Sequence, residues 1–126
     1  PAIPPRKIPQ FFPEGIILGL FGGNLLEVGQ FLYRNDNFLM LLAGDARRAH
    51  QFLDKVVALH LAKLETYLGA VGDCIDIIVF GDDLGMQTGP QVSPAMYREF
   101  FKPRHRLLWQ RAKQLAGVKV MLHCCG

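Results

Sequence analysis

Short, largely apolar runs mark three candidate strands in the chain. The first two, Gly15–Phe21 and Ile75–Gly81, are bounded by glycine or aspartate, and the third, Val118–Leu122, follows Gly117. The largely apolar run Ile75–Gly81 is typical of a parallel strand that is buried on both faces. The pattern therefore predicts three strands of a parallel sheet.

The segment between the first two strands has the spacing of helices. From Leu25, apolar residues recur at helical intervals and predict a helix of about ten residues that ends near Asn35. A short apolar helix is expected at Phe38–Leu42. Asp45 is a suitable N-cap for a long helix that continues to about Leu68. We therefore expect three consecutive helices before the second strand.

A serine followed by a proline marks the start of a further helix. Ser93 is expected to cap backbone N–H groups, and Pro94 suits the first helical position. The apolar spacing continues to Leu115. A break or kink is expected at Pro103, because proline has no N–H and its ring clashes with the preceding turn. Gly117 then ends the helix and leads into the third strand.

The order strand, helices, strand, helix, strand is typical of parallel α/β folds. A (β/α)8 TIM barrel and a doubly wound sheet both fit this order, and the pattern alone does not separate them. A complete barrel needs about 250 residues, so the 126 residues are expected to be part of a longer protein. Five prolines among the first fourteen residues predict an extended arm at 1–14, followed by an incomplete barrel domain at 15–126.

Composition narrows the setting in which the protein is expected to work. No apolar run approaches the roughly 20 residues that cross a bilayer, and no secretion signal is visible. Two of the three cysteines are adjacent and do not easily form a disulfide with each other, which favours a reducing cytoplasm. The net charge is +3, and the basic residues at 98–113 alternate with core-type residues, as on a solvated helix face. Neither a membrane nor a nucleic acid is therefore an expected partner.

Functional groups of parallel α/β folds gather where strands end. Gly22-Gly23-Asn24 follows the first strand but lacks the spacing of a dinucleotide-binding loop, so a tight turn is expected there. Asp82 and Asp83 follow the second strand. As paired carboxylates they can act as acid and base, hold a cationic substrate, or cap backbone donors in the glycine-rich turn. Gln87, in the same turn, can orient a polar group of a substrate.

The third strand ends in a His-Cys-Cys-Gly sequence. Because side chains alternate along a strand, His123 and Cys125 are expected to share one face while Cys124 points to the other. An imidazole and a thiolate on one face form half of a zinc site, although buried cysteines are also common packing residues. Cys74 precedes its strand and His123 follows its own, so parallel strands place them at opposite ends of the sheet. A third ligand is therefore expected beyond Gly126.

Several motifs together resemble the uroporphyrinogen decarboxylase superfamily. The resemblance covers most of the chain from residue 15 onward, and its motifs occur in order. They are Ala70-Val71-Gly72-Asp73, Asp76-Ile77-Ile78, Gly81-Asp82-Asp83-Leu84-Gly85-x-Gln87, Ser93-Pro94-x-Met96-Tyr97-Arg98-Glu99-Phe100 with Pro103, and His123-x-Cys125-Gly126. That superfamily has a (β/α)8 barrel, so the resemblance favours the barrel over the doubly wound sheet.

The resemblance favours one of two chemistries. Corrinoid-linked methyltransferases of the superfamily move a methyl group between a cobalamin protein and a thiol that zinc holds as a thiolate. They carry a His-x-Cys pair at a strand end and another cysteine much further along, which here would lie beyond the last residue. His123 and Cys125 match the pair and are the expected zinc ligands. Asp82 and Asp83 are then the expected catalytic residues at the barrel mouth, with Gln87 contacting a small-molecule substrate.

Two alternatives stay open. Uroporphyrinogen decarboxylases remove acetate carboxyls from a tetrapyrrole without a metal or cofactor, and Asp82 or Asp83 would then contact protonated pyrrole nitrogens. Their arginine-rich N-terminal segment is not visible in this chain. The third reading is a non-catalytic barrel relative that binds a corrinoid protein or a small ligand. In every case three barrel strands leave open edges and a bare inner face, so this chain alone is expected to self-associate or to be poorly stable.

Overall fold

The computed structural model describes residues 14–126, so the predicted arm lies outside the described residues except for its last position. The centre of the fold is a sheet of three parallel strands, β1 (Leu18–Gly22), β2 (Ile77–Gly81) and β5 (Lys119–His123), in the order β1-β2-β5. The other elements are α2 (Leu26–Tyr33), α3 (Asn35–Gly44), α4 (Ala46–Val71), β3 (Gly85–Met86), β4 (Gly89–Pro90), α5 (Pro94–Met96), a π-helical turn (Tyr97–Phe101) and α6 (Lys102–Leu115).

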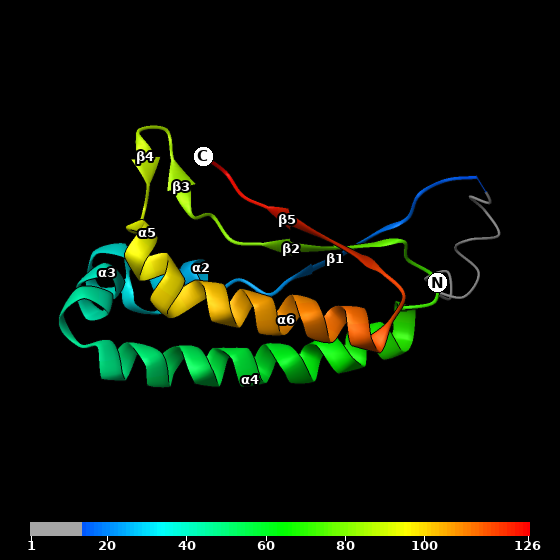
Figure 1. The fold of residues 1–126 in the computed structure, drawn as a ribbon, viewed down its shortest axis with the longest axis horizontal. Helices are drawn as coiled ribbons and strands as arrows, with labels where there is room; N and C mark the ends of the chain where they lie inside the picture. The colour runs from blue at the N-terminus through cyan, green and yellow to red at the C-terminus, as the bar shows by residue number, and fades with distance from the viewer. Residues whose placement is uncertain (1–13) are drawn as a thin grey trace.

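The helices cover one face of this sheet, with α4 and α6 side by side beneath the strands (Figure 1). The core between helices and sheet contains side chains that are at most 2% exposed, among them Leu53, Leu64, Ile78, Phe80 and Leu108. The opposite face is bare: Leu18, Leu20 and Met121 are 50%, 77% and 43% exposed. The parallel strands are adjacent in the order in which they occur along the chain, and the helices form one layer on a single face of the sheet. This arrangement is that of a partial (β/α) barrel. The expected self-association stays a prediction.

Burial on both faces, predicted for Ile75–Gly81, is confirmed at β2, whereas β1 and β5 are exposed on the inner face. The reason is geometric, because β1 and β5 lie at the two edges and nothing among the described residues covers the inner face. The alternation predicted for β5 is confirmed. Val120 and Leu122 are half-buried toward the helices, whereas Lys119, Met121 and His123 are exposed.

The predicted helix starts are confirmed by their caps. The carboxylate of Asp45 accepts a hydrogen bond from the Arg48 backbone nitrogen at 3.1 Å at the start of α4. The hydroxyl of Ser93 accepts one from the Met96 backbone nitrogen at 3.1 Å at the start of α5. By contrast, α2 ends at Tyr33, earlier than expected, because Arg34 adopts a positive φ of 69° that no α-helix can include.

The break predicted at Pro103 is replaced by a wider turn of the same helix. In the π-helical turn Tyr97–Phe101, the Lys102 backbone nitrogen donates to the carbonyl of Tyr97, five residues earlier. The guanidinium of Arg104 also donates to the Phe100 carbonyl at 2.7 Å. The helix therefore continues through Pro103 after a wider turn and does not end there.

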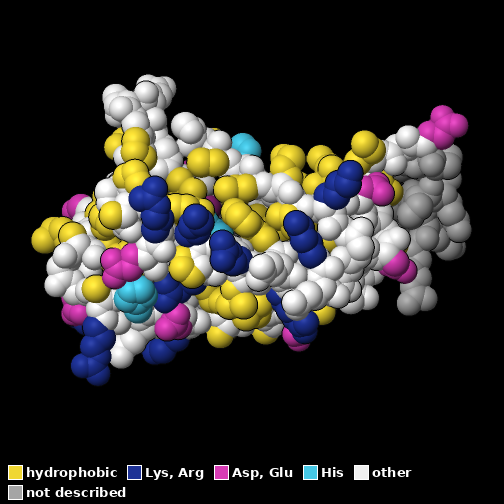
Figure 2. Space-filling view, in the orientation of Figure 1, with side chains coloured by type: hydrophobic (Ala, Val, Ile, Leu, Met, Phe, Trp, Pro, Cys, Tyr) yellow, Lys and Arg dark blue, Asp and Glu magenta, His cyan; other side chains and the backbone are white. Residues whose placement is uncertain are grey.

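The basic segment at 98–113 lies on the outer surface, where Figure 2 shows a row of Lys and Arg side chains over α6. Arg98, Lys102, Arg106 and Lys113 are exposed. Arg104 instead pairs with Asp54 at 2.6 Å, which ties α6 to α4. The segment is therefore a solvated helix face with a cross-link to its neighbour. Among the described residues, no helix has the length and apolar character needed to cross a membrane.

Candidate metal centre

The carboxyl ends of β2 and β5 meet at the same level of the sheet. Gly81 stands opposite His123 in the parallel register, and the Asp82 backbone nitrogen donates to the His123 carbonyl at 3.1 Å. The residues that follow each strand therefore lie side by side although about forty positions separate them in the sequence. This edge holds the expected site residues Asp82, Asp83, His123 and Cys125.

Asp83, His123 and Cys125 form one cluster of potential metal ligands. One ligand atom from each lies within 4.8 Å of the others. The Cys125 sulfur is 3.4 Å from Nε2 of His123, and the Cys125 backbone nitrogen donates to Oδ1 of Asp83 at 2.8 Å. His123 and Cys125 are exposed and Asp83 is half-buried. The cluster is therefore both preformed and accessible.

The donor set and its spacing fit a zinc ion. A thiolate sulfur, an imidazole nitrogen and a carboxylate oxygen are the three kinds of ligand that zinc takes from proteins. Zinc–sulfur and zinc–nitrogen bonds of about 2.3 and 2.0 Å at a tetrahedral angle put the two ligand atoms about 3.5 Å apart. The observed separation between Cys125 and His123 is 3.4 Å. Little movement would therefore be needed for both atoms to bind one ion.

Negative charge beside the cluster raises the pKa of its thiol. The charge of Asp83, together with a hydrogen bond to it, raises the pKa of Cys125 above the usual 9.0. Burial raises the pKa of Glu27, whose Oε1 accepts the Asp83 backbone N–H at 2.7 Å. The charge of Glu27 also adds to the shift at Cys125. A bound cation would oppose this repulsion, since it favours the ionised forms.

Asp82 occupies a different environment from its neighbour, because its side chain is completely buried. Its carboxylate accepts from the backbone nitrogens of Leu25 and Leu26 at 3.0 and 3.1 Å, and from that of Glu27 at 3.3 Å. These are the unpaired donors at the start of α2, which has no side-chain cap of its own. Of the predicted roles, the geometry of Asp82 matches backbone capping, although at α2 and not in the glycine-rich turn.

His105 lies behind Asp82 and was not singled out by the sequence. Its Nε2 is 2.9 Å from Asp82 Oδ2, and its ring stacks on Trp109 with centroids 5.0 Å apart. The available signal was the helical spacing of Phe101, His105 and Leu108, which places the imidazole on the buried stripe of α6. A similar signal existed for Glu27, which follows Asn24 by three residues, as in a capping box.

Gln87 lies apart from the cluster. It is exposed in the turn of the hairpin formed by β3 and β4, which projects beyond the sheet (Figure 1). The hairpin lines a hollow of about 580 Å³ together with Cys124. Cys124 accepts a hydrogen bond from the Leu84 backbone nitrogen at 3.3 Å, so it faces the hairpin and not the metal ligands, as alternation predicts. Gln91 anchors the hairpin by donating to the Asp83 carbonyl at 2.7 Å.

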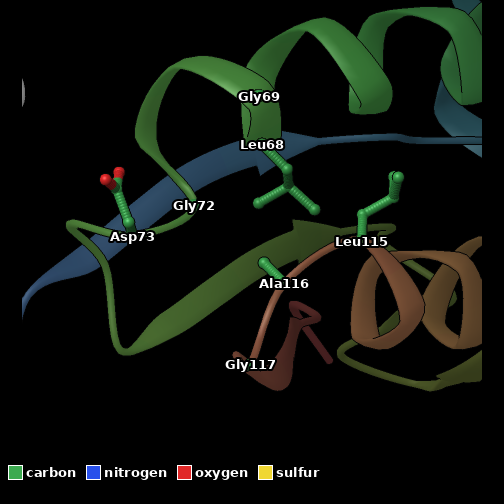
Figure 3. Close-up of a pocket in the computed structure, with 7 residues that line it drawn as sticks. All are labelled: Leu68, Gly69, Gly72, Asp73, Leu115, Ala116 and Gly117. Carbon is green, nitrogen blue, oxygen red and sulfur yellow. The ribbon is translucent and has the colours of Figure 1, made fainter.

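The opposite end of the sheet carries a second hollow, of about 290 Å³, between the ends of α4 and α6 (Figure 3). Asp73 is its single ionisable lining residue, and in Figure 3 this side chain points away from Leu68 and Leu115. Cys74 is adjacent, at the end of β2 farthest from His123, as predicted. This end of the sheet therefore has a hollow with one carboxylate, whereas the cluster of potential metal ligands lies at the carboxyl end of the strands.

Comparison with known proteins agrees with the motifs. The family model described as Uroporphyrinogen decarboxylase (URO-D) matches residues 29–126, a span that includes both aspartates, His123 and Cys125. Neither the curated proteins nor the solved structures include a match to the chain. Because the family match covers most of the sequence and ends on the cluster described above, the chain belongs to the uroporphyrinogen decarboxylase family.

Proposed function

We propose that the protein transfers a methyl group between a corrinoid and a small thiol, with a zinc ion held by His123, Cys125 and Asp83. The observation that carries the proposal is the cluster itself, in which the three ligand atoms lie within 4.8 Å of one another. In this proposal Asp83 is the third zinc ligand, in place of the residue that we expected beyond Gly126. Membership of the family supports an enzymatic function for the protein. The sulfur-containing set of potential ligands favours the methyltransferase branch of the superfamily.

Zinc bound at this site would supply Lewis acidity, so that a substrate thiol loses its proton at neutral pH. His123 and Cys125 would hold the ion from the end of β5, and Asp83 would complete the protein ligands from the end of β2. In this reaction the thiolate sulfur would take the methyl group from the corrinoid substrate, the electron pair of the broken bond would remain with the corrinoid, and the thiol proton would go to solvent. The hairpin around Gln87 would contact the small-molecule substrate, because its hollow is lined also by Cys124 and Gly126, the two neighbours of Cys125 in the sequence.

The test is the zinc content of the full-length protein, measured beside its activity. We expect about one zinc per chain in the wild type, retained in Cys124→Ala and lost in both His123→Ala and Cys125→Ala. Cys124→Ala is the matched control, because this adjacent thiol faces the hairpin. Retention of zinc and turnover in Cys125→Ala would overturn the proposal.

The other readings give different outcomes in the same experiment. A wild type without zinc that decarboxylates uroporphyrinogen would identify the metal-free branch and make Asp83 the residue to replace first. Tight binding of a corrinoid protein without any product would identify a non-catalytic relative. Zinc binding with methyl transfer to a thiol would eliminate both alternatives.

A further inference from the structure

We propose that Asp82 and His105 form a buried positioning pair that fixes the metal-binding edge of the sheet without touching substrate. The site that they position is the one proposed above, so the metal-affinity part of this inference rests on the proposed function. The pair itself is carried by independent geometry. Asp82 is 0% exposed and His105 is 2% exposed, and their contact is 2.9 Å.

The hydrogen bonds around His105 have a defined direction. The carboxylate of Asp82 can only accept, so Nε2 of His105 is the donor. In the neutral ring Nδ1 is then the acceptor, and the hydroxyl of Tyr97, 3.3 Å away, donates to it. Burial and the charge of Asp82 raise the pKa of Tyr97, which keeps this hydroxyl protonated. Tyr97, His105 and Asp82 therefore form a relay that runs from the π-helical turn before α6, through α6, to the end of β2.

The relay continues through α2 to the ligand cluster. Asp82 binds the first backbone N–H groups of α2 and so fixes the position of Glu27 in its first turn. Glu27 accepts the Asp83 N–H at 2.7 Å, and Asp83 accepts the Cys125 N–H at 2.8 Å. Each member thus holds the next one in place. A change at His105 is transmitted to Cys125 although the two residues are not in contact.

The end of β5 needs this support. Cys125 lies beyond the last residue of the strand and is exposed, so sheet pairing does not hold it. Its backbone is tied to the neighbouring strand end by the hydrogen bond to Asp83. A metal site requires its ligands within about 0.5 Å of the productive geometry. Loss of an outer hydrogen-bond partner of a metal ligand typically lowers metal affinity by about 10-fold to 100-fold.

The experiment compares His105→Leu with His105→Gln in the full-length protein. Glutamine can place an amide N–H near the position of Nε2, whereas leucine fills the space without a donor. Two readouts are needed: amide hydrogen exchange at Asp83 and Cys125 in metal-free protein, and the zinc dissociation constant from chelator competition. We expect His105→Leu to speed exchange at both amides about tenfold and to weaken zinc binding by about 10-fold to 100-fold, with recovery in His105→Gln.

His50→Ala is the matched control. His50 also joins α4 to the α6 region, through Arg104 and Glu99, but has no contact with the relay. It should leave exchange at Asp83 and Cys125 and the zinc affinity at wild-type values.

If His105→Leu does not fold, Tyr97→Phe, which removes one hydroxyl, replaces it and should speed exchange at the same amides. Unchanged exchange at Asp83 and Cys125, or equal loosening in His50→Ala, would overturn the inference. A wild type that binds no zinc would refute the proposed function instead, while the exchange comparison would still decide the positioning role.

Discussion

Replacement of Asp82 by asparagine should separate the two adjacent aspartates by their effect on stability. The Asp82 carboxylate is fully buried and surrounded by donors. Oδ2 accepts from Leu25, Leu26 and His105, and Oδ1 accepts from Leu26 and Glu27. An asparagine amide puts an NH2 group in place of one oxygen. Whichever way the amide turns, its nitrogen faces at least two N–H donors.

The magnitude follows from those contacts. A hydrogen bond to a charged group contributes about 1.5–3 kcal/mol. Two lost bonds with partial relaxation therefore predict that Asp82→Asn lowers the free energy of unfolding by about 3–5 kcal/mol. Asp83→Asn should lower it by less than about 1 kcal/mol, because Asp83 is only half-buried and bonds to an exposed segment.

Urea unfolding of the full-length protein, followed by circular dichroism, measures both changes. With a slope of about 2 kcal/mol per molar urea, the Asp82→Asn midpoint should fall by about 2 M, whereas that of Asp83→Asn should move by about 0.5 M or less. Zinc content, measured on the same samples below their transitions, should fall in Asp83→Asn. Equal midpoints for the two variants would refute the assignment of Asp82 to the buried frame.

Two other predictions concern packing and pH. A methyl group at Gly29 would overlap the ring of Phe38, so Gly29→Ala should destabilise the protein by about 1–3 kcal/mol. Gly69 lies on an open part of α4, so Gly69→Ala should be neutral or stabilising by up to about 1 kcal/mol. The urea midpoints of both variants test these two expectations. Burial lowers the pKa of His60 below its usual 6.5, so His60 binds a proton more readily in the unfolded chain than in the folded one. The stability that depends on neutral His60 is therefore complete above pH 6.5 and should be lost as the pH falls through the lowered pKa of the folded state. His60→Gln removes the titrating group, while its amide can still donate to the Asn24 carbonyl. The difference in the free energy of unfolding between about pH 7.5 and about pH 5.5 should therefore be smaller in this variant, and an unchanged difference would contradict the prediction.

The elements that the sequence predicts well are those that carry their own local signals. The apolar run before Gly81 and the caps at Asp45 and Ser93 act over a few residues, and each appears in the structure. The π-helical turn was not predicted, because Pro103 signals that the helix is interrupted but not the form that the interruption takes. The positive φ at Arg34 has no sequence signal of its own.

The composition of the ligand cluster depends on strand register, which the sequence does not state. Alternation was enough to put His123 and Cys125 on one face. Asp83 joins them because β2 and β5 are neighbours and Gly81 pairs with His123. A shift of that register along the strands would bring a different residue beside Cys125. The third ligand was therefore sought beyond the chain although a candidate was already present within it.

The different environments of Asp82 and Asp83 follow from the same alternation, once one face of β2 is known. Ile78 and Phe80 point toward the helices, so Asp82, two residues further, points the same way and meets the start of α2. Asp83 shares the parity of Gly81 and therefore emerges beside His123. The sequence of β2 cannot reveal this parity, because every residue of the strand before Gly81 is apolar and either face could be the core. In β5 the polar positions reveal it, and the register then transfers that information to β2. The two aspartates therefore have different environments, and we propose different roles for them: Asp82 supports the frame, whereas Asp83 faces the side from which substrate would approach.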